Sequence, residues 1–285
     1  KYNELESLGV TPNNIAVHCD LNVDTIRNDD VIIGSKLTDA SMSNGDFKIK
    51  VKEIEDSHEV SASYKHIVNR WKLDSLSGST VTNSINTTYN GTQSGGVAVS
   101  SGTGPFENDV LSFDGSNDYI TISNAQSLIT NYFHNKDTFS VSVWVYFDSS
   151  TGGTQEFLYA GLGSGVGAYL HIQRLNADSK IKFGFAGSDL ITNSTFNYST
   201  WYHLSFVFDS SVGKKVYING LLDASNSQNN KLNITANYVV NIGARNSSSN
   251  QFKGKLSDLR IYNTSLGAEQ IASLYQNSVS KDTER

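Results

Sequence analysis

The chain contains few of the residues that constrain a fold covalently: its 285 residues include one cysteine and two prolines. A single cysteine excludes an internal disulfide, so core packing and β-ladders must hold the fold together. No apolar run approaches the roughly 20 residues that a membrane-spanning helix needs. Lys and Arg are scattered and the formal net charge is −6, which predicts neither nucleic-acid binding nor membrane insertion.

What the chain does contain is enough for a sizeable core, because 38% of its residues are hydrophobic. A length of 285 residues fits one large all-β domain, with or without a smaller module. The first residue is Lys and no signal segment follows it, so we expect a processed product or a piece of a longer chain.

The first 66 residues differ from the rest in carrying most of the paired charges. Within them, Phe47 to Glu55 alternates apolar residues with lysines, which is typical of a half-exposed strand. We predict a small β-rich module or assembly arm over residues 1–66, followed by a separate domain over residues 67–285.

From Val68 onward, short apolar runs alternate with turns rich in Gly, Ser and Asn, which predicts a β-sandwich. In Thr138 to Phe147, "TFSVSVWVYF", every second residue is a large apolar one. The Asn219-Gly220 pair predicts a type I′ hairpin, because both central residues of that turn need positive φ. Only the end has a helical period, with Leu266, Ile271 and Leu274 on one face.

These segments occur in a characteristic order. "RWKLD" precedes "LSFDGSNDYITI", "FSVSVWVYF", "STWYHLSFVFD", "KKVYINGLLD" and "KGKLSDLRIY". The series resembles the laminin-G-like, concanavalin A-like lectin and glucanase family over residues 68–278. Gly267 stands where the family usually has Ser before its last helix, a change that a helix N-cap tolerates. The resemblance implies an all-β, two-sheet antiparallel jelly-roll sandwich with one short C-terminal helix.

Catalysis is the first function to weigh. Glucanases of this fold carry several acidic residues on alternate positions of one strand, because hydrolysis needs two carboxyl groups. No such run occurs here, which predicts that the chain is not an enzyme. Polysaccharide lyases of this fold use His, Tyr, Arg and Gln, and the chain offers Tyr169, His171, Gln173 and Arg174. A lyase therefore remains an alternative.

Sugar binding needs an aromatic face with polar groups beside it. Trp71, Trp144 and Trp201 fall on positions that are structural in the family, which leaves smaller aromatic residues. The candidates in the groove that the family uses are Tyr159, Tyr169, His171 and Arg174. The candidates on the rim loops are Asp189, Tyr198, Arg245, Asn246 and Phe252.

The resemblance also implies one structural Ca²⁺, held by an Asp of the last strand together with backbone carbonyls. That Asp would be Asp258, with Gly115 as carbonyl donor and Asp114 as a further ligand. The alternative is that Asp258 pairs with Arg260. We interpret Asp114 and Asp118 as parts of a hairpin corner rather than as a catalytic pair.

The leading hypothesis is a non-catalytic recognition module that binds a glycan or glycoprotein as part of a larger secreted or surface-displayed protein. The alternative is a structural or attachment module of a virion, phage or cell-surface assembly, with residues 1–66 docking onto neighbouring subunits. The third is a lyase or glucanase. All three place the chain outside the cell or on a surface.

Overall fold

The computed structural model describes residues 26–27, 30–32, 48–50 and 66–280, with side chains described from 66 to 276. The chain separates into two compact units, residues 1–61 and 62–285. The first unit contains an antiparallel three-stranded sheet of β1 (Ile26–Arg27), β2 (Asp30–Ile32) and β3 (Lys48–Lys50). The remainder of the predicted module, and its predicted docking role, lie outside the described residues.

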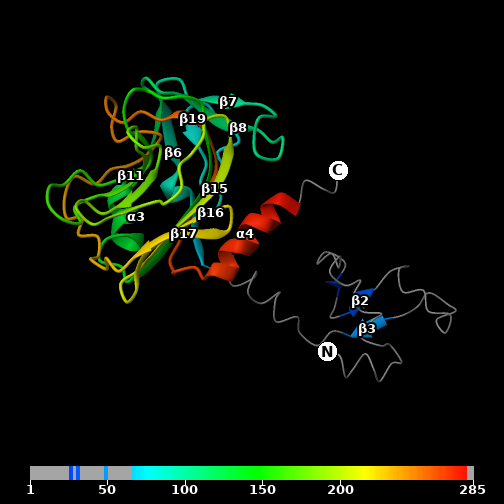
Figure 1. The fold of residues 1–285 in the computed structure, drawn as a ribbon. Helices are drawn as coiled ribbons and strands as arrows, with labels where there is room; N and C mark the ends of the chain where they lie inside the picture. Colours follow the sequence, from blue (N-terminus) through cyan, green and yellow to red (C-terminus); the bar gives the residue numbers. More distant parts are fainter. Residues whose placement is uncertain (1–25, 28–29, 33–47, 51–65, 281–285) are drawn as a thin grey trace. The chain divides into compact units, whose positions relative to one another are not determined.

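The second unit is built from two eight-stranded antiparallel sheets, here called sheet I and sheet II (Figure 1). Sheet I contains, in spatial order, β17 (Leu221–Asn226), β16 (Gly213–Ile218), β15 (Trp201–Asp209), β10 (Thr138–Phe147), β19 (Lys253–Tyr262), β8 (Val110–Asp114) and β7 (Ala98–Ser100), and β4 (Ile67–Trp71) pairs with β19. Sheet II contains β14 (Asp189–Ile191), β13 (Ile181–Gly184), β12 (Leu170–Arg174), β11 (Gln155–Ala160), β18 (Val240–Ile242), β9 (Tyr119–Ile122), β6 (Gly91–Ser94) and β5 (Thr80–Val81). The predicted two-sheet sandwich is confirmed.

The core lies between the two sheets and is built by strand alternation. On β10 the predicted inward residues, from Phe139 to Phe147, are all buried in one hydrophobic cluster. Leu170 and Ile172 of β12 join the same cluster from sheet II. Because side chains alternate along a strand, the residues between them face outward, and these outward faces are where binding groups can be displayed.

The Asn219-Gly220 turn joins β16 to β17 as predicted. Asn219 has φ 50° and Gly220 has φ 83°, and Ile218 lies opposite Leu221 across the two-residue loop. Positive φ at both positions matches the right-handed twist of the flanking strands.

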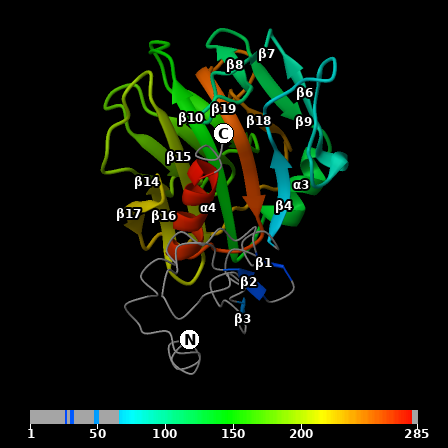
Figure 2. The same cartoon turned by 90° about the vertical axis from the view of Figure 1, so that its right-hand side faces the viewer.

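Helix α4 (Ala268–Ser280) confirms the predicted C-terminal helix. Ile271 and Leu274 of α4, together with Leu266 shortly before the helix, pack on the outer face of sheet I. Figure 2 shows α4 lying over the strands of this sheet. The cluster that joins them comprises Val207, Tyr217, Tyr262, Leu266, Ile271 and Leu274. Gly267 donates its N–H to Gln270 Oε1 at 2.9 Å, which satisfies one free donor at the helix start. In the described residues, no helix has the length and apolarity to traverse a bilayer.

A second α-helix, α3 (Ala125–Tyr132), was not predicted, and neither was the short 3-10 helix η4 (Thr87–Tyr89). Helix α3 buries Leu128 and Ile129. Its first residue follows Asn124, which has φ 51° and makes no side-chain cap. With only two turns and no capping signal, the segment has too little periodicity to be distinguished from a loop in the sequence.

Candidate functional site

The outer face of sheet II carries a continuous row of polar and aromatic residues. Register places them directly opposite one another from strand to strand, because each lies on the face away from the core. The row consists of Asp189, Gly184, His171, Tyr159, Asn241, Thr121 and Thr92. Thr121 Oγ1 donates to Asn241 Oδ1 at 3.0 Å, which links β9 to β18. The strand pairing therefore assembles one surface from residues far apart in the sequence.

A β-bulge adds Glu156 to this surface. Glu156 lies opposite Gln173, whereas Leu158 lies opposite Ile172, so β11 has one extra residue between them. The extra residue puts Glu156 on the same face as Tyr159, although simple alternation would put them on opposite faces. Sequence reasoning missed Glu156 because a bulge leaves no reliable signal in the residues themselves.

Aromatic rings and a guanidinium form the upper layer of the site. The ring of Tyr169 lies 5.4 Å from that of Tyr159 and 5.3 Å from that of His171. The guanidinium of Arg245 lies 5.0 Å from the centre of the Tyr169 ring and 5.2 Å from that of Tyr159. Tyr169 and Arg245 are half-buried, whereas Tyr159 is fully covered. Four of the predicted groove and rim residues, His171 included, are thus brought together.

Beneath this layer are polar atoms that are shielded from solvent and have few hydrogen-bond partners. Glu156 Oε1 and the Tyr159 hydroxyl are buried without a hydrogen bond of ordinary geometry in the described part of the chain. Burial raises the pKa of Glu156 well above its usual range. Burial likewise raises the pKa of Tyr159 to about 12, against the opposing charge of Arg245. With a pKa of about 12, the Tyr159 hydroxyl is neutral near pH 7 and able to donate a hydrogen bond.

At one end of the row, His171 and Asp189 form an oriented pair. His171 Nε2 lies 3.0 Å from Asp189 Oδ1, and Lys182 Nζ lies 3.3 Å from Asp189 Oδ2. Burial opposes ionisation of Asp189, but His171 and Lys182 overcome it and lower the pKa of the carboxyl. Gly184 lies on β13, opposite both His171 on β12 and Asp189 on β14. Because glycine has no side chain, it leaves room for the imidazole.

Replacing Gly184 with alanine is expected to separate this pair. The added Cβ would lie 1.9 Å from His171 Nε2 and 2.1 Å from Asp189 Oδ1, so both side chains must move. We expect a loss of about 1–3 kcal/mol in the free energy of unfolding, measured by urea denaturation. Gly153→Ala is the matched control, because its Cβ would meet nothing within 4 Å. Equal stability of the two variants would contradict this account of Gly184.

Two predicted sugar-binding residues lie elsewhere. Arg174 follows Ile172 on the inward face of β12 and is 1% exposed. Its guanidinium lies 4.5 Å from the Tyr198 ring centre and donates to Ser179 Oγ at 2.8 Å. Tyr198, 38% exposed, therefore covers a buried arginine and is not part of the row. The prediction for Arg174 was wrong, because alternation turns it away from the outer face of sheet II. Tyr198 lies on a loop as predicted, and its part in sugar binding stays a prediction.

Phe252 was predicted to lie on the rim and is instead a core residue. Its side chain is fully buried, and its ring lies 5.7 Å from Phe113 and 5.9 Å from Phe147. Its N–H donates to the carbonyl of Gly243 at 2.8 Å, which directs the chain back toward the sheets. Burying such a ring stabilises the fold by about 2 kcal/mol. The polar neighbours of Phe252 in the sequence concealed this burial.

Asn246 lies in the loop that follows Arg245 and organises that loop. Its Oδ1 accepts the N–H of Ser248 at 3.0 Å and the hydroxyl of Ser249 at 2.9 Å. Its carbonyl accepts from Gln251 Nε2 at 2.9 Å, while Gln251 Oε1 is buried without a partner among the described residues. Asn246 thus shapes the loop that carries Arg245, and Gln251 is a residue that sequence reasoning missed.

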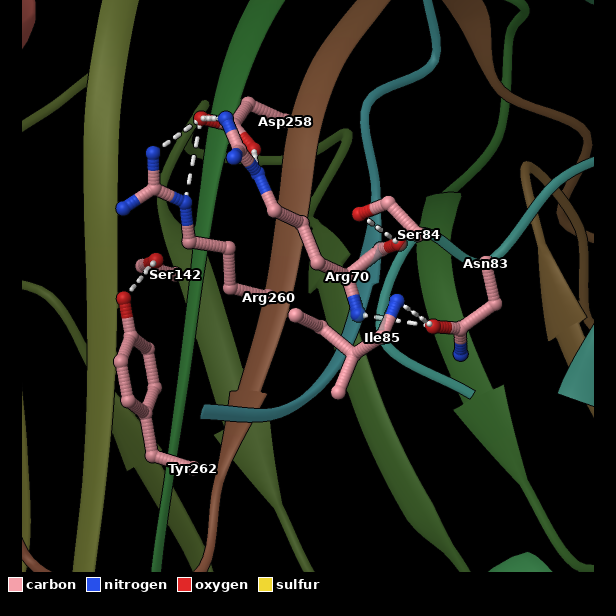
Figure 3. A network of polar contacts seen from close by, with 8 residues as sticks. All are labelled: Arg70, Asn83, Ser84, Ile85, Ser142, Asp258, Arg260 and Tyr262. Carbon is pink, nitrogen blue, oxygen red and sulfur yellow. Dashed lines mark hydrogen bonds and ion pairs between the residues drawn. The ribbon is translucent and has the colours of Figure 1, made fainter. Parts of the chain in front are cut away.

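The predicted calcium ligand Asp258 is bound by two arginines (Figure 3). Its Oδ1 accepts from Arg70 Nε at 2.7 Å, and its Oδ2 accepts from Arg70 at 3.2 Å and from Arg260 Nε at 3.1 Å. Burial opposes ionisation of Asp258, but the charge of Arg260 and the bonds from both arginines lower its pKa. A carboxylate whose two oxygens face two guanidinium groups does not fit a Ca²⁺ ion.

The other two predicted calcium residues lie away from Asp258. Asp114 is opposite Lys253 at the start of β19, whereas Asp258 lies in the middle of that strand. At the rise per residue of a β-strand, this separation puts Gly115 roughly 15 Å from Asp258. Instead, Asp114 donates its N–H to Asp118 Oδ2 at 2.8 Å and closes the hairpin corner. In the described residues, no group of three or more His, Cys, Asp or Glu side chains is arranged to hold a metal. Calcium binding stays a prediction that these three residues do not support as a shared site.

Comparison with solved structures gives relatives of the fold. Domain 4 of AbnA, a GH43 extracellular arabinanase from Geobacillus stearothermophilus solved with arabinotriose, has TM-score 0.59 and 20% identity over 74% of this chain and 98% of that chain. The binding domain of botulinum neurotoxin serotype D has TM-score 0.58 and 16% identity over 78% of this chain and 53% of that chain. A Trypanosoma rangeli sialidase has TM-score 0.56 and 17% identity over 77% of this chain and 34% of that chain.

The matches to the toxin domain and the sialidase cover about half and one third of those chains, so they concern only part of each protein. No curated protein sequence matches closely enough to count as a relative. A family model does match: Laminin_G_3, the concanavalin A-like lectin/glucanases superfamily, covers residues 114–272, which is more than half of the chain. The two-sheet fold and this match agree with the order of motifs in the sequence. The chain belongs to the concanavalin A-like lectin/glucanases superfamily.

Proposed function

We propose that the chain is a non-catalytic module that binds glycan on the outer face of sheet II. We further propose that it works within a larger secreted or surface-displayed protein. The observation that carries the proposal is the layered cluster around β11 and β12. The half-buried Tyr169 ring and the Arg245 guanidinium lie above the buried polar groups of Glu156 and Tyr159.

This arrangement suits a saccharide for two reasons. The face of a tyrosine ring packs against the apolar C–H face of a sugar, while a guanidinium donates to its hydroxyls. Below them, Glu156 and Tyr159 are fully buried, so they support the Tyr169 ring and the Arg245 guanidinium from beneath rather than contact the ligand. Sites for small ligands generally combine an apolar contact surface with a few placed polar groups of this kind.

The comparisons support the ligand class. The arabinanase domain is matched over almost its whole length and was solved with arabinotriose, so an arabinose oligomer is the natural first probe. It comes from an extracellular enzyme, which supports a secreted setting. Botulinum neurotoxin type C, whose cell entry depends on two ganglioside molecules, is matched over 52% of its chain and supports glycan recognition less directly.

The placement of the two carboxyl groups supports a binding role over a hydrolytic one. Glycosidases use one carboxyl group as an acid and a second as a base or nucleophile, and both must reach the glycosidic bond. Here Glu156 is fully buried, and Asp189 is held in ion pairs by His171 and Lys182. The lyase alternative is weakened because Arg174 faces the core, away from His171.

The test is a glycan array followed by calorimetric titration, with arabinotriose included as a defined soluble probe. We expect saturable binding to at least one glycan, weakened about tenfold or more by Tyr169→Ala and by Arg245→Ala. Tyr198→Ala is the matched control, because it removes an exposed tyrosine away from the cluster. Absence of any bound glycan, or equal binding by the Tyr169 and Tyr198 variants, would refute the proposal.

A further inference from the structure

A second row of aromatic and cationic residues crosses the outer face of sheet I. Register places Trp201 of β15 opposite Tyr146 of β10, Tyr146 opposite Lys255 of β19, and Lys255 opposite Ser112 of β8. Figure 2 shows these neighbouring strands side by side. Because adjacent strands are about 4.8 Å apart, the row is roughly 14 Å long and runs perpendicular to the strands.

The aromatic members of this row are partly exposed to solvent and held in place. The ring centres of Tyr146 and Trp201 are 5.5 Å apart at an angle of 51°. Trp201 donates its Nε1–H to the carbonyl of Thr103 at 3.1 Å, which fixes the indole. Trp71 and Trp144 are 0% and 6% exposed, whereas Trp201 and Tyr146 are half-buried. All three tryptophans fall on positions that are structural in the family, but the partial exposure of Trp201 distinguishes it from the other two.

The charge beside these rings is positive. Lys255 Nζ lies 4.4 Å from the centre of the Tyr146 ring, and no carboxylate of the described residues lies within ion-pair distance of it. Farther along β19 and β4, Arg70 and Arg260 share the single carboxylate of Asp258, which leaves one positive charge in excess. This local charge is opposite in sign to the net charge of the chain, −6.

We propose that Trp201, Tyr146 and Lys255 form a second saccharide-binding surface, and that this surface takes acidic sugars. The C–H face of a pyranose packs on the two rings, and the carboxylate or sulfate of the sugar accepts a hydrogen bond from Lys255. The proposal depends on observations at sheet I and is independent of the proposed site on sheet II. A chain with both surfaces binds a neutral and an acidic part of one glycan, or two separate glycans.

The test is a titration of intrinsic tryptophan fluorescence with tri-galacturonate and with neutral galactotriose. Trp71 and Trp144 are buried, so a ligand on the row changes the emission of Trp201 specifically. We expect a saturable change with tri-galacturonate, with Kd of about 0.1–1 mM and weakening in salt. Galactotriose, which lacks the carboxylates, is expected to bind at least about tenfold more weakly. A heparin-derived tetrasaccharide, added as a third probe, separates preference for sulfate from preference for carboxylate.

The key variant is Lys255→Gln, which removes the charge from a half-buried surface position and is expected to weaken tri-galacturonate binding about fivefold or more. Tyr146→Leu is expected to have a comparable effect, while Lys215→Gln on β16 is the charge-matched control that preserves binding. Tyr169→Ala alters only the sheet II surface and is expected to leave the fluorescence titration unchanged. Absence of a saturable change up to about 10 mM would overturn the proposal. Equal affinities for the two trisaccharides, or full binding by Lys255→Gln, would do the same.

Discussion

Replacing Asp258 with asparagine is expected to lower the free energy of unfolding by about 2–3 kcal/mol at pH 7. The side chain of Asp258 is 18% exposed, and those of Arg70 and Arg260 are 29% and 12% exposed. Removing the shared carboxylate leaves two guanidinium groups facing each other with little water to screen them. Asparagine is the sharpest replacement, because Asp258 has φ 52° and asparagine tolerates that left-handed conformation.

The matched control is Asp137→Asn. Asp137 Oδ1 lies 2.7 Å from Lys231 Nζ, the same distance that joins Arg70 to Asp258, but its side chain is 73% exposed. We expect little change in this variant, since exposed ion pairs contribute weakly. Urea denaturation of both variants measures the difference. A loss for Asp258→Asn no larger than that for Asp137→Asn would show that burial of the arginine network contributes nothing.

A comparison of the wild type with Asp258→Asn also tests the calcium prediction. A ligand that binds only the folded state raises its stability. If Asp258 held calcium, millimolar Ca²⁺ would stabilise the wild type and not Asp258→Asn. With both oxygens already accepting from arginines, we expect Ca²⁺ to change the two proteins equally.

Sequence periodicity predicted the sandwich because each strand signals its own buried face. The alternation in "TFSVSVWVYF" identified the core side of β10, and Asn219-Gly220 identified one hairpin. These features depend on residues that are neighbours along the chain. Pairing between strands depends on residues that are far apart in the chain. The pairing of Tyr159 with both His171 and Asn241 therefore could not be predicted from any one segment.

The parts of the candidate site that sequence reasoning missed have specific physical causes. Glu156 needed knowledge of the bulge in β11, which reverses the face of every residue before it. Arg174 was misplaced because it is close to His171 in the chain. Alternation along β12 nevertheless places the two side chains on opposite faces of the strand. Phe252 was misplaced because its polar neighbours concealed a return toward the core.

The second large effect concerns acid stability, through His203 on β15. Its ring lies 5.2 Å from that of Trp144 and 6.1 Å from that of Tyr275 of α4, and it is 4% exposed. Burial, together with the positive charge of Arg260, lowers the pKa of His203 from 6.5 to about 3. The folded protein therefore keeps this imidazole neutral under conditions in which the unfolded chain protonates it.

The sign of the effect follows from linkage. Below pH 6.5 the unfolded state binds a proton at His203 that the folded state does not bind, so stability falls as the pH falls. The loss attributable to this one group is about 1.4 kcal/mol per pH unit and reaches about 4 kcal/mol near pH 3. Above pH 6.5 both states are neutral at this position and the contribution is constant.

His203→Phe isolates this contribution, because phenylalanine keeps a ring between Trp144 and Tyr275 and cannot titrate. Other groups act on both proteins alike, including Glu156, whose raised pKa works in the opposite direction at higher pH. Urea denaturation between pH 8 and pH 4 is expected to give a constant difference down to about pH 6.5 and then a steady gain of the variant relative to the wild type. Parallel stability curves across the whole range would mean that the folded state admits a proton at His203, and that α4 does not keep this histidine dry.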